Sequence, residues 1–230
     1  MPTIGIVLRY SELKDGRNIL YLGERIRRTF QNAGALIIPI VPVQDVNYYS
    51  TSYNDFSELN ELEKNELEKY LDMVDGVVFP GGFKSAPYEK YLLDRCIERD
   101  IPTLGICLGM QLISNYKRDD FIVELNDSNI IHKQEDDNIL SHKIKINKDT
   151  LLYRIFGQDE IIVNSFHKFH ALENDNVVIN AYSEDGYIEG VEVSGKRFIL
   201  GVQWHPEISY SFDDNSKKLI NYFINECSND

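Results

Sequence analysis

The sequence has few of the features that mark membrane, disulfide-rich or nucleic-acid-binding proteins. Only three of its 230 residues are cysteines, and their spacing matches neither a disulfide framework nor a zinc motif. No apolar run approaches the roughly 18 residues that indicate a membrane-spanning helix. Basic residues are outnumbered, with 24 Lys and Arg against 37 Asp and Glu and a formal charge of −13. This charge argues against a nucleic-acid partner, and we expect a cytoplasmic protein.

Two of the cysteines and two histidines have simple structural interpretations. Cys96 and Cys227 fall on the apolar faces of predicted helices, which makes them core residues. His132 and His142 stand in a polar region without further ligands at a recognisable spacing. The sequence therefore predicts no metal site and no cofactor.

The order of apolar segments predicts an α/β fold. Short apolar runs at 3–8, 35–41, 74–79 and 101–106 are typical of buried strands, and helical patterns separate them. This alternation predicts a mostly parallel central sheet with helices on both faces, which makes three layers. From about residue 141 the pattern changes to successive strands at 160–163, 177–183, 187–193 and 197–203, which predicts a more antiparallel portion. We expect a single domain over residues 1–230, with the polar stretch at 117–138 as an irregular loop or short hairpin.

Cys107 lies where a strand is predicted to turn sharply into a helix. Residues 105–109 read Gly-Ile-Cys-Leu-Gly, and the small residues on either side are typical of a nucleophile elbow. The positive end of the helix dipole favours the thiolate form of such a thiol. The alternative is that Cys107 is a small buried hydrophobic residue, as many free cysteines are.

A second segment supplies a base and a carboxylate. Residues 201–207 read Gly-Val-Gln-Trp-His-Pro-Glu, and Pro206 favours an extended conformation at His205. In an extended segment Glu207 lies on the same side as His205 and can orient its imidazole. Cys107, His205 and Glu207 then have the roles of nucleophile, base and orienting acid. The alternative for His205 is a histidine that closes a strand and bonds only to the backbone.

A glycine-rich segment after the predicted strand at 74–79 offers donors for a developing negative charge. Residues 80–82 read Pro-Gly-Gly, and we expect the amides of Gly82 and Leu108 to form an oxyanion hole. An ordinary turn after a strand is the alternative interpretation.

Four ordered motifs together resemble the class I glutamine amidotransferase superfamily, and they span nearly the whole chain. The motifs are Pro-Gly-Gly at 80–82, Gly-Ile-Cys-Leu-Gly-Met-Gln at 105–111, Val-Asn-Ser-Phe-His at 163–167 and the segment at 201–207. Within the superfamily the chain is most similar to the γ-glutamyl hydrolase branch of cysteine peptidases. The resemblance implies a catalytic triad that cleaves the side-chain amide of a γ-glutamyl group. It also implies that the glutamyl group is held by Gln111, Asn164, Ser165, Phe166 and His167, although Gln111 is alternatively a helix-facing polar residue.

Two segments differ from the pattern of the branch, and both lie where substrate specificity would be set. After the elbow helix the branch has a glycine-rich stretch that ends in Gln-Asp, where this chain has Asn-Tyr-Lys-Arg-Asp-Asp-Phe at 115–121. After the Asn-Ser pair the branch has paired histidines followed by glutamine, where this chain has His-Lys-Phe-His at 167–170. The amine side of the substrate therefore stays open.

The leading hypothesis is hydrolysis of a small γ-glutamyl compound through a Cys107 thioester, which releases glutamate and an amine. One alternative is a glutaminase subunit that takes glutamine and delivers ammonia to a separate synthetase partner. Another is a non-enzymatic binding protein on the same fold, which the presence of all three triad residues disfavours.

Overall fold

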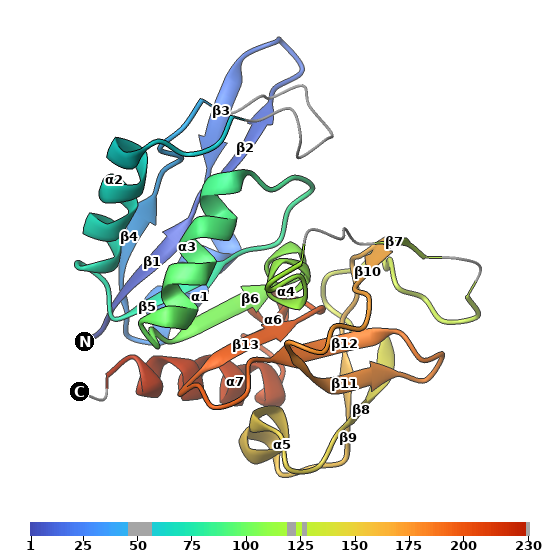
Figure 1. The fold of residues 1–230 in the computed structure, drawn as a ribbon. Helices are drawn as coiled ribbons and strands as arrows, with labels where there is room; N and C mark the ends of the chain where they lie inside the picture. The colour runs from blue at the N-terminus through green and yellow to red at the C-terminus, as the bar shows by residue number, and fades with distance from the viewer. Residues whose placement is uncertain (46–56, 119–122, 126–127, 229–230) are drawn as a thin grey trace.

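The protein is built around one mixed sheet of nine strands. A computed structural model describes residues 1–45, 57–118, 123–125 and 128–228. The strand order is β4-β1-β5-β6-β13-β12-β11-β8-β9, and the sheet crosses the molecule from one edge to the other (Figure 1). The α/β fold with a mixed sheet agrees with the sequence prediction.

One half of the sheet is parallel, and its strands come mainly from the first half of the chain. β4, β1, β5, β6 and β13 pair in parallel with one another in this order. Their bounds are Leu36–Ile40, Thr3–Val7, Gly76–Phe79, Thr103–Ile106 and Ile199–Val202. All residues of β5, β6 and β13 are buried, as expected for parallel strands that helices cover on both faces.

The other half is antiparallel, also as predicted. β12 (Ile188–Glu192) pairs with β13 and with β11 (Val178–Ser183), β11 with β8 (His142–Ile146), and β8 with β9 (Glu160–Val163). β9 begins and ends at the predicted residues, and the other strands for which a run was predicted are each one to three residues shorter than that run.

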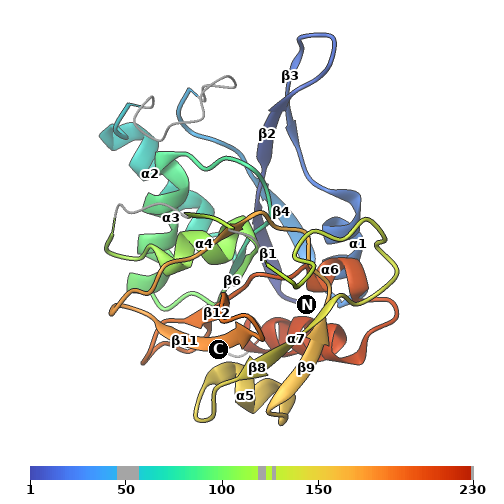
Figure 2. The same ribbon diagram turned by 90° about the vertical axis from the view of Figure 1, so that its right-hand side faces the viewer.

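Helices cover both faces of the sheet, which gives three layers (Figure 2). One face packs against α1 (Glu24–Asn32), α5 (Leu151–Phe156) and α7 (Asp214–Glu226). The opposite face packs against α2 (Glu61–Leu71), α3 (Pro87–Glu98) and α4 (Leu108–Ser114). Cys96 and Cys227 are buried in these two layers, so their assignment to the core is confirmed. Among the described residues, none of the helices is both long and apolar enough to cross a membrane.

Two small sheets lie outside the main one. β2 (Arg9–Glu12) and β3 (Asn18–Tyr21) form a hairpin that the sequence analysis did not predict, and it extends away from the body of the molecule (Figure 1). β7 (Val123–Glu124) pairs with β10 (Phe169–His170). Residues 119–122 and 126–127 of the stretch predicted as a loop or hairpin lie outside the described residues.

Candidate active site

The carboxyl ends of three neighbouring parallel strands bring the predicted site residues together. β5, β6 and β13 are adjacent in the sheet and end at Phe79, Ile106 and Val202. The glycine-rich segment follows β5 directly, Cys107 follows β6 directly, and His205 comes shortly after β13. Because parallel strands end at the same edge, segments that are far apart in sequence meet where open α/β sheets bind ligands.

Cys107 occupies a strained turn between β6 and α4. Its backbone has φ 53° and ψ −103°, and it is the N-cap residue of α4. For a residue other than glycine this backbone conformation costs about 1–3 kcal/mol of folding free energy, which the surrounding structure must offset. The strain and the strand-to-helix position are those of a nucleophile elbow.

Two glycines let the elbow form. A Cβ atom at Gly105 would lie 2.5 Å from the carbonyl oxygen of Gly109, and one at Gly109 would lie 2.1 Å from the carbonyl oxygen of Phe79. Both distances are too short for a side chain against backbone. The elbow therefore packs against β5 only because these positions are glycine.

His205 and Glu207 form a close pair, although not in the predicted manner. Nδ1 of His205 lies 2.7 Å from Oε1 of Glu207. His205 has φ −112° and ψ 82°, but Pro206 then begins the short helix α6 (Pro206–Ser209), which contains Glu207. The expected extended segment through residue 207 was therefore wrong, because proline suits the first helical position as well as it restricts the residue before it. The first turn of α6 brings the carboxylate back to the imidazole.

The surroundings of His205 favour its protonated form. Burial lowers the pKa of His205, but the neighbouring Glu207 carboxylate and the Cys107 thiol raise it by more, so it lies well above its ordinary value. The side chains of His205 and Glu207 are 14% and 9% exposed. His205 therefore lies between the carboxylate of Glu207 and the side chain of the predicted nucleophile.

The backbone of His205 is fixed by a buried asparagine. Oδ1 of Asn164 accepts from the His205 amide at 2.8 Å, and Nδ2 donates to the His205 carbonyl at 2.8 Å and to Ser209 Oγ at 3.1 Å. On another side, a Cβ atom at Gly81 would lie 2.7 Å from Cε1 of His205 and 3.4 Å from Cβ of Cys107. Gly81 therefore lies against both the predicted base and the predicted nucleophile.

The two residues predicted to form the oxyanion hole are neighbours in space. A Cβ atom at Gly82 would lie 3.3 Å from Cδ2 of Leu108 and 2.9 Å from Cδ of Arg9. The segment at 80–82 thus lies between the start of α4 and the Arg9 side chain. This closeness is compatible with the predicted role of both amides.

Arg9 binds the backbone of the glycine-rich segment, a contact that was not predicted from the sequence. Its guanidinium donates to the carbonyls of Pro80 and Gly81 and forms a buried ion pair with Glu89. The other oxygen of Glu89 accepts from the backbone amide of Ala86. Nothing in the sequence indicates this pair, since its residues are 80 positions apart on a strand and a helix.

Most of the residues predicted to bind the glutamyl group are buried and bonded to protein. Nε2 of Gln111 donates to Oε1 of Gln203 and to the Phe169 carbonyl, and Ser165 bonds to Gln134 and to the His132 carbonyl. Phe166 is half-buried, and its ring meets His205 edge-on at 5.7 Å between centroids. The residues of this group that lie beside His205 are Asn164 and Phe166, and substrate binding by all five remains a prediction.

His132 and His142 do have further ligand-type side chains beside them, so the prediction that they stand without such partners was wrong. The fold brings both next to His167 and the buried carboxylate of Glu189. The four residues come from separate segments, so no local spacing in the sequence could have revealed the cluster.

Comparison with known proteins agrees with this geometry. The family model of Peptidase C26 matches residues 84–207, more than half of the chain. The chain is thus a cysteine hydrolase of the class I glutamine amidotransferase type. It belongs to the Peptidase C26 family, in agreement with the resemblance found in the sequence.

Similar proteins include both separate chains and parts of larger enzymes. Protein NtpR of Enterococcus hirae is 24% identical, and the alignment covers 98% of this chain and 99% of that protein. CTP synthase of Methanocaldococcus jannaschii is 28% identical over 89% of this chain but only 42% of that enzyme. The glutaminase domain of Trypanosoma brucei CTP synthase, solved with bound acivicin, has a similar fold, with a TM-score of 0.68 and 16% identity over 99% of this chain and 94% of that one.

Proposed function

We propose that the protein hydrolyses the γ-glutamyl amide bond of a small γ-glutamyl compound through a Cys107 thioester. The observation that carries this proposal is Cys107 on a strained elbow, at the sheet edge that also holds the hydrogen-bonded pair of His205 and Glu207. Such a nucleophile, with an oriented base, is the arrangement that acyl transfer requires.

In the proposed mechanism the Cys107 thiolate attacks the amide carbonyl carbon of the substrate. The negative charge on the resulting tetrahedral oxygen is stabilised by the backbone amides of Gly82 and Leu108. The His205 imidazolium gives its proton to the amine nitrogen, the carbon–nitrogen bond breaks, and the amine leaves. The glutamyl group then remains on Cys107 as a thioester.

Deacylation uses the same groups in reverse. Neutral His205 takes a proton from water, and the hydroxyl oxygen attacks the thioester carbonyl. Collapse of the second tetrahedral intermediate breaks the carbon–sulfur bond and releases glutamate. The Cys107 thiolate and the His205 imidazolium are restored. Glu207 keeps the imidazole oriented through the contact at Nδ1.

The test is glutamate release from a panel of γ-glutamyl amides and from free glutamine, with wild type compared with Cys107→Ala. We expect cleavage of at least one γ-glutamyl amide that disappears in Cys107→Ala, and intact-protein mass spectrometry should detect the acylated wild-type chain. Full activity of Cys107→Ala would refute the mechanism. Turnover of glutamine with no cleavage of the other amides would refute the proposed substrate class.

A second candidate is a glutaminase that supplies ammonia to a separate synthetase. The similarity to one part of the M. jannaschii CTP synthase favours it, since the alignment covers 42% of that enzyme. In that case the chain should co-purify with a larger protein, and its glutaminase activity should depend on that partner. We rank it second because the sequence motifs resemble the γ-glutamyl hydrolase branch more closely.

A further inference from the structure

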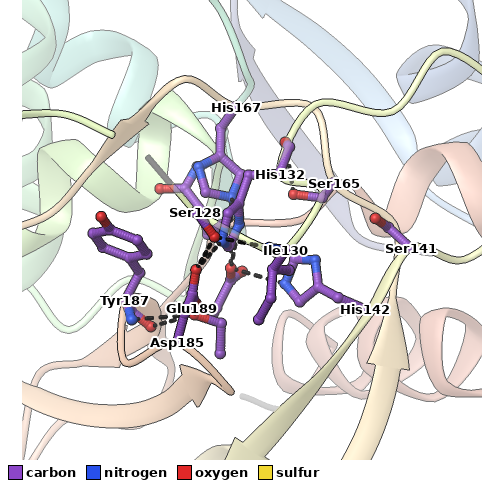
Figure 3. Close-up of polar contacts among 12 residues, drawn as sticks. Ser128, Ile130, His132, Ser141, His142, Ser165, His167, Asp185, Tyr187 and Glu189 are labelled. Carbon is purple, nitrogen blue, oxygen red and sulfur yellow. Dashed lines mark hydrogen bonds and ion pairs between the residues drawn. The ribbon is translucent and has the colours of Figure 1, made fainter. Parts of the chain in front are cut away.

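A buried cluster of three histidines surrounds one carboxylate on the side of the fold that holds β8 and β12. His132 precedes β8, His142 begins it, His167 lies between β9 and β10, and Glu189 belongs to β12. All four side chains are buried, and they point toward one another (Figure 3). Oε1 of Glu189 lies 3.1 Å from Nε2 of His142 and 3.5 Å from both Nδ1 of His132 and Nε2 of His167.

The outward nitrogens of the three rings all face oxygen acceptors. Nε2 of His132 lies 2.9 Å from Oδ2 of Asp185, and Nδ1 of His167 lies 3.0 Å from the Phe169 carbonyl. Nδ1 of His142 lies 3.4 Å from the Ile131 carbonyl. A neutral imidazole carries one N–H, and each ring can satisfy its outward acceptor only by placing that hydrogen there. Each inward nitrogen then carries a lone pair and no hydrogen.

With all three rings neutral, the centre of the cluster would therefore lack positive charge. Nδ1 of His132 lies 3.2 Å from Nε2 of His167, and both inward nitrogens face the Glu189 carboxylate. Oε2 of Glu189 is also buried and has no hydrogen-bond partner in the described structure. Burying unpaired acceptors and a carboxylate together is costly. A cation at the centre, or extra protons on the rings, would remove this cost.

The spacing of the inward atoms suits a small tetrahedral cation. Zinc bonds of about 2.0–2.1 Å in a tetrahedron place neighbouring ligand atoms about 3.3–3.4 Å apart. Four of the six separations between the inward atoms, at 3.1, 3.2, 3.5 and 3.5 Å, bracket that value. One ligand atom from each of His132, His142 and Glu189 lies within 4.8 Å of the others. His167 lies outside this compact set, so its ring would have to move toward an ion that the other three bind. The outward contacts to carboxylate and carbonyl oxygens are the second-shell partners that zinc-binding histidines usually have.

We propose that the protein binds one Zn²⁺ ion between His132, His142, His167 and Glu189. Four protein ligands with no open position are typical of a structural zinc site rather than a catalytic one. The site would join the segment at 130–134 to the segment at 164–170. These segments already meet through the His167 amide and the His132 carbonyl at 2.8 Å. Phe166, beside His167, contacts His205, so the ion would stiffen one wall of the candidate active site.

The test measures zinc in protein that carries no affinity tag. Cys107 and His205 form a second place where zinc could bind, so the titrations use a Cys107→Ala background. After removal of metal with a chelator, we expect one equivalent of Zn²⁺ to bind per chain and to raise the midpoint of thermal unfolding. Removing the metal again should lower that midpoint by the same amount.

Three variants in the same background locate the ion. Glu189→Gln keeps the shape of the side chain but removes its charge, and His142→Ala removes one ligand; we expect both to lose stoichiometric zinc. His170→Ala is the matched control, because the chain has five histidines and this one bonds to the Ala171 carbonyl outside the cluster. It should bind one equivalent, as the background does.

Two results would overturn the proposal. One is a folded Cys107→Ala protein that binds no stoichiometric zinc and whose unfolding midpoint responds to neither zinc nor chelator, which would assign the cluster to extra protons instead. The other is retention of the full equivalent by both Glu189→Gln and His142→Ala. Because the first result needs only the folded background protein, the proposal can be refuted even if both cluster variants fail to fold.

Discussion

Replacement of Asn164 by alanine separates two roles for this residue, support of His205 and recognition of the substrate. Its side chain makes three hydrogen bonds, two of them to the backbone of His205, and it is fully buried. Each such bond contributes about 1 kcal/mol net, and a buried group left without a partner costs about 1–3 kcal/mol. We therefore expect Asn164→Ala to lower the free energy of unfolding by about 2–4 kcal/mol.

The kinetic consequence follows from the displaced base. If the backbone of His205 loses its anchor, the imidazole leaves its position beside Cys107, and a misplacement of about 1 Å costs up to roughly 100-fold in rate. We expect kcat to fall between about 10-fold and 100-fold, with little change in KM. Replacement of a residue that binds the glutamyl group would instead raise KM.

Asn174→Ala is a matched control for this experiment. Asn174 is also a buried asparagine, and its Nδ2 donates to the carbonyls of Ser114 and Tyr116 rather than to His205. Denaturant unfolding and steady-state kinetics should show a similar loss of stability and an unchanged kcat per folded molecule. An Asn164→Ala protein with wild-type stability and kcat, but a higher KM, would contradict the positioning role.

Three further changes test other parts of the site. Glu207→Gln removes the charge that helps to raise the pKa of His205. Because loss of the imidazolium proton ends the active state, the alkaline limb of a pH profile of kcat/KM should move to lower pH. A limb that does not move would contradict this account. Arg9→Met leaves the Glu89 carboxylate buried without its partner and should cost about 3–5 kcal/mol in denaturant unfolding, whereas a double variant that also carries Glu89→Met should recover much of this loss. Gly109→Ala places a methyl group 2.1 Å from a backbone oxygen, so purified protein should be unfolded or without activity, and a folded, fully active Gly109→Ala would show that the elbow has more room than its geometry allows.

The fold was largely predictable because its signals are local. Short apolar runs separated by helical patterns indicate buried parallel strands, and β1, β4, β5 and β6 lie where those runs were found. The same holds for Cys107, since glycines at positions 105 and 109 mark a tight elbow within five residues. The pairing of His205 with Glu207 was also predicted, although through an extended segment instead of the first turn of α6.

The features that sequence reasoning missed are contacts between distant segments. Arg9 and Glu89 are 80 residues apart, and a single arginine after a strand carries no pattern that indicates a buried partner. The β2–β3 hairpin was missed because most of its residues are exposed or half-buried, so it lacks a strong alternation of apolar and polar positions.

The buried polar residues around His205 show how sequence motifs and structural roles can differ. Asn164 and Ser165 belong to a motif that predicts substrate binding, and their side chains also form hydrogen bonds with His205, Ser209 and the His132 carbonyl. Such contacts hold the base and the neighbouring histidine cluster at fixed positions, which catalysis requires as much as it requires substrate recognition. The same residues would form the motif whether their role is to position the base or to bind the substrate, so the sequence alone does not distinguish the two roles. Specificity for the amine would then depend on more exposed neighbours such as Phe166, whose ring meets His205 edge-on.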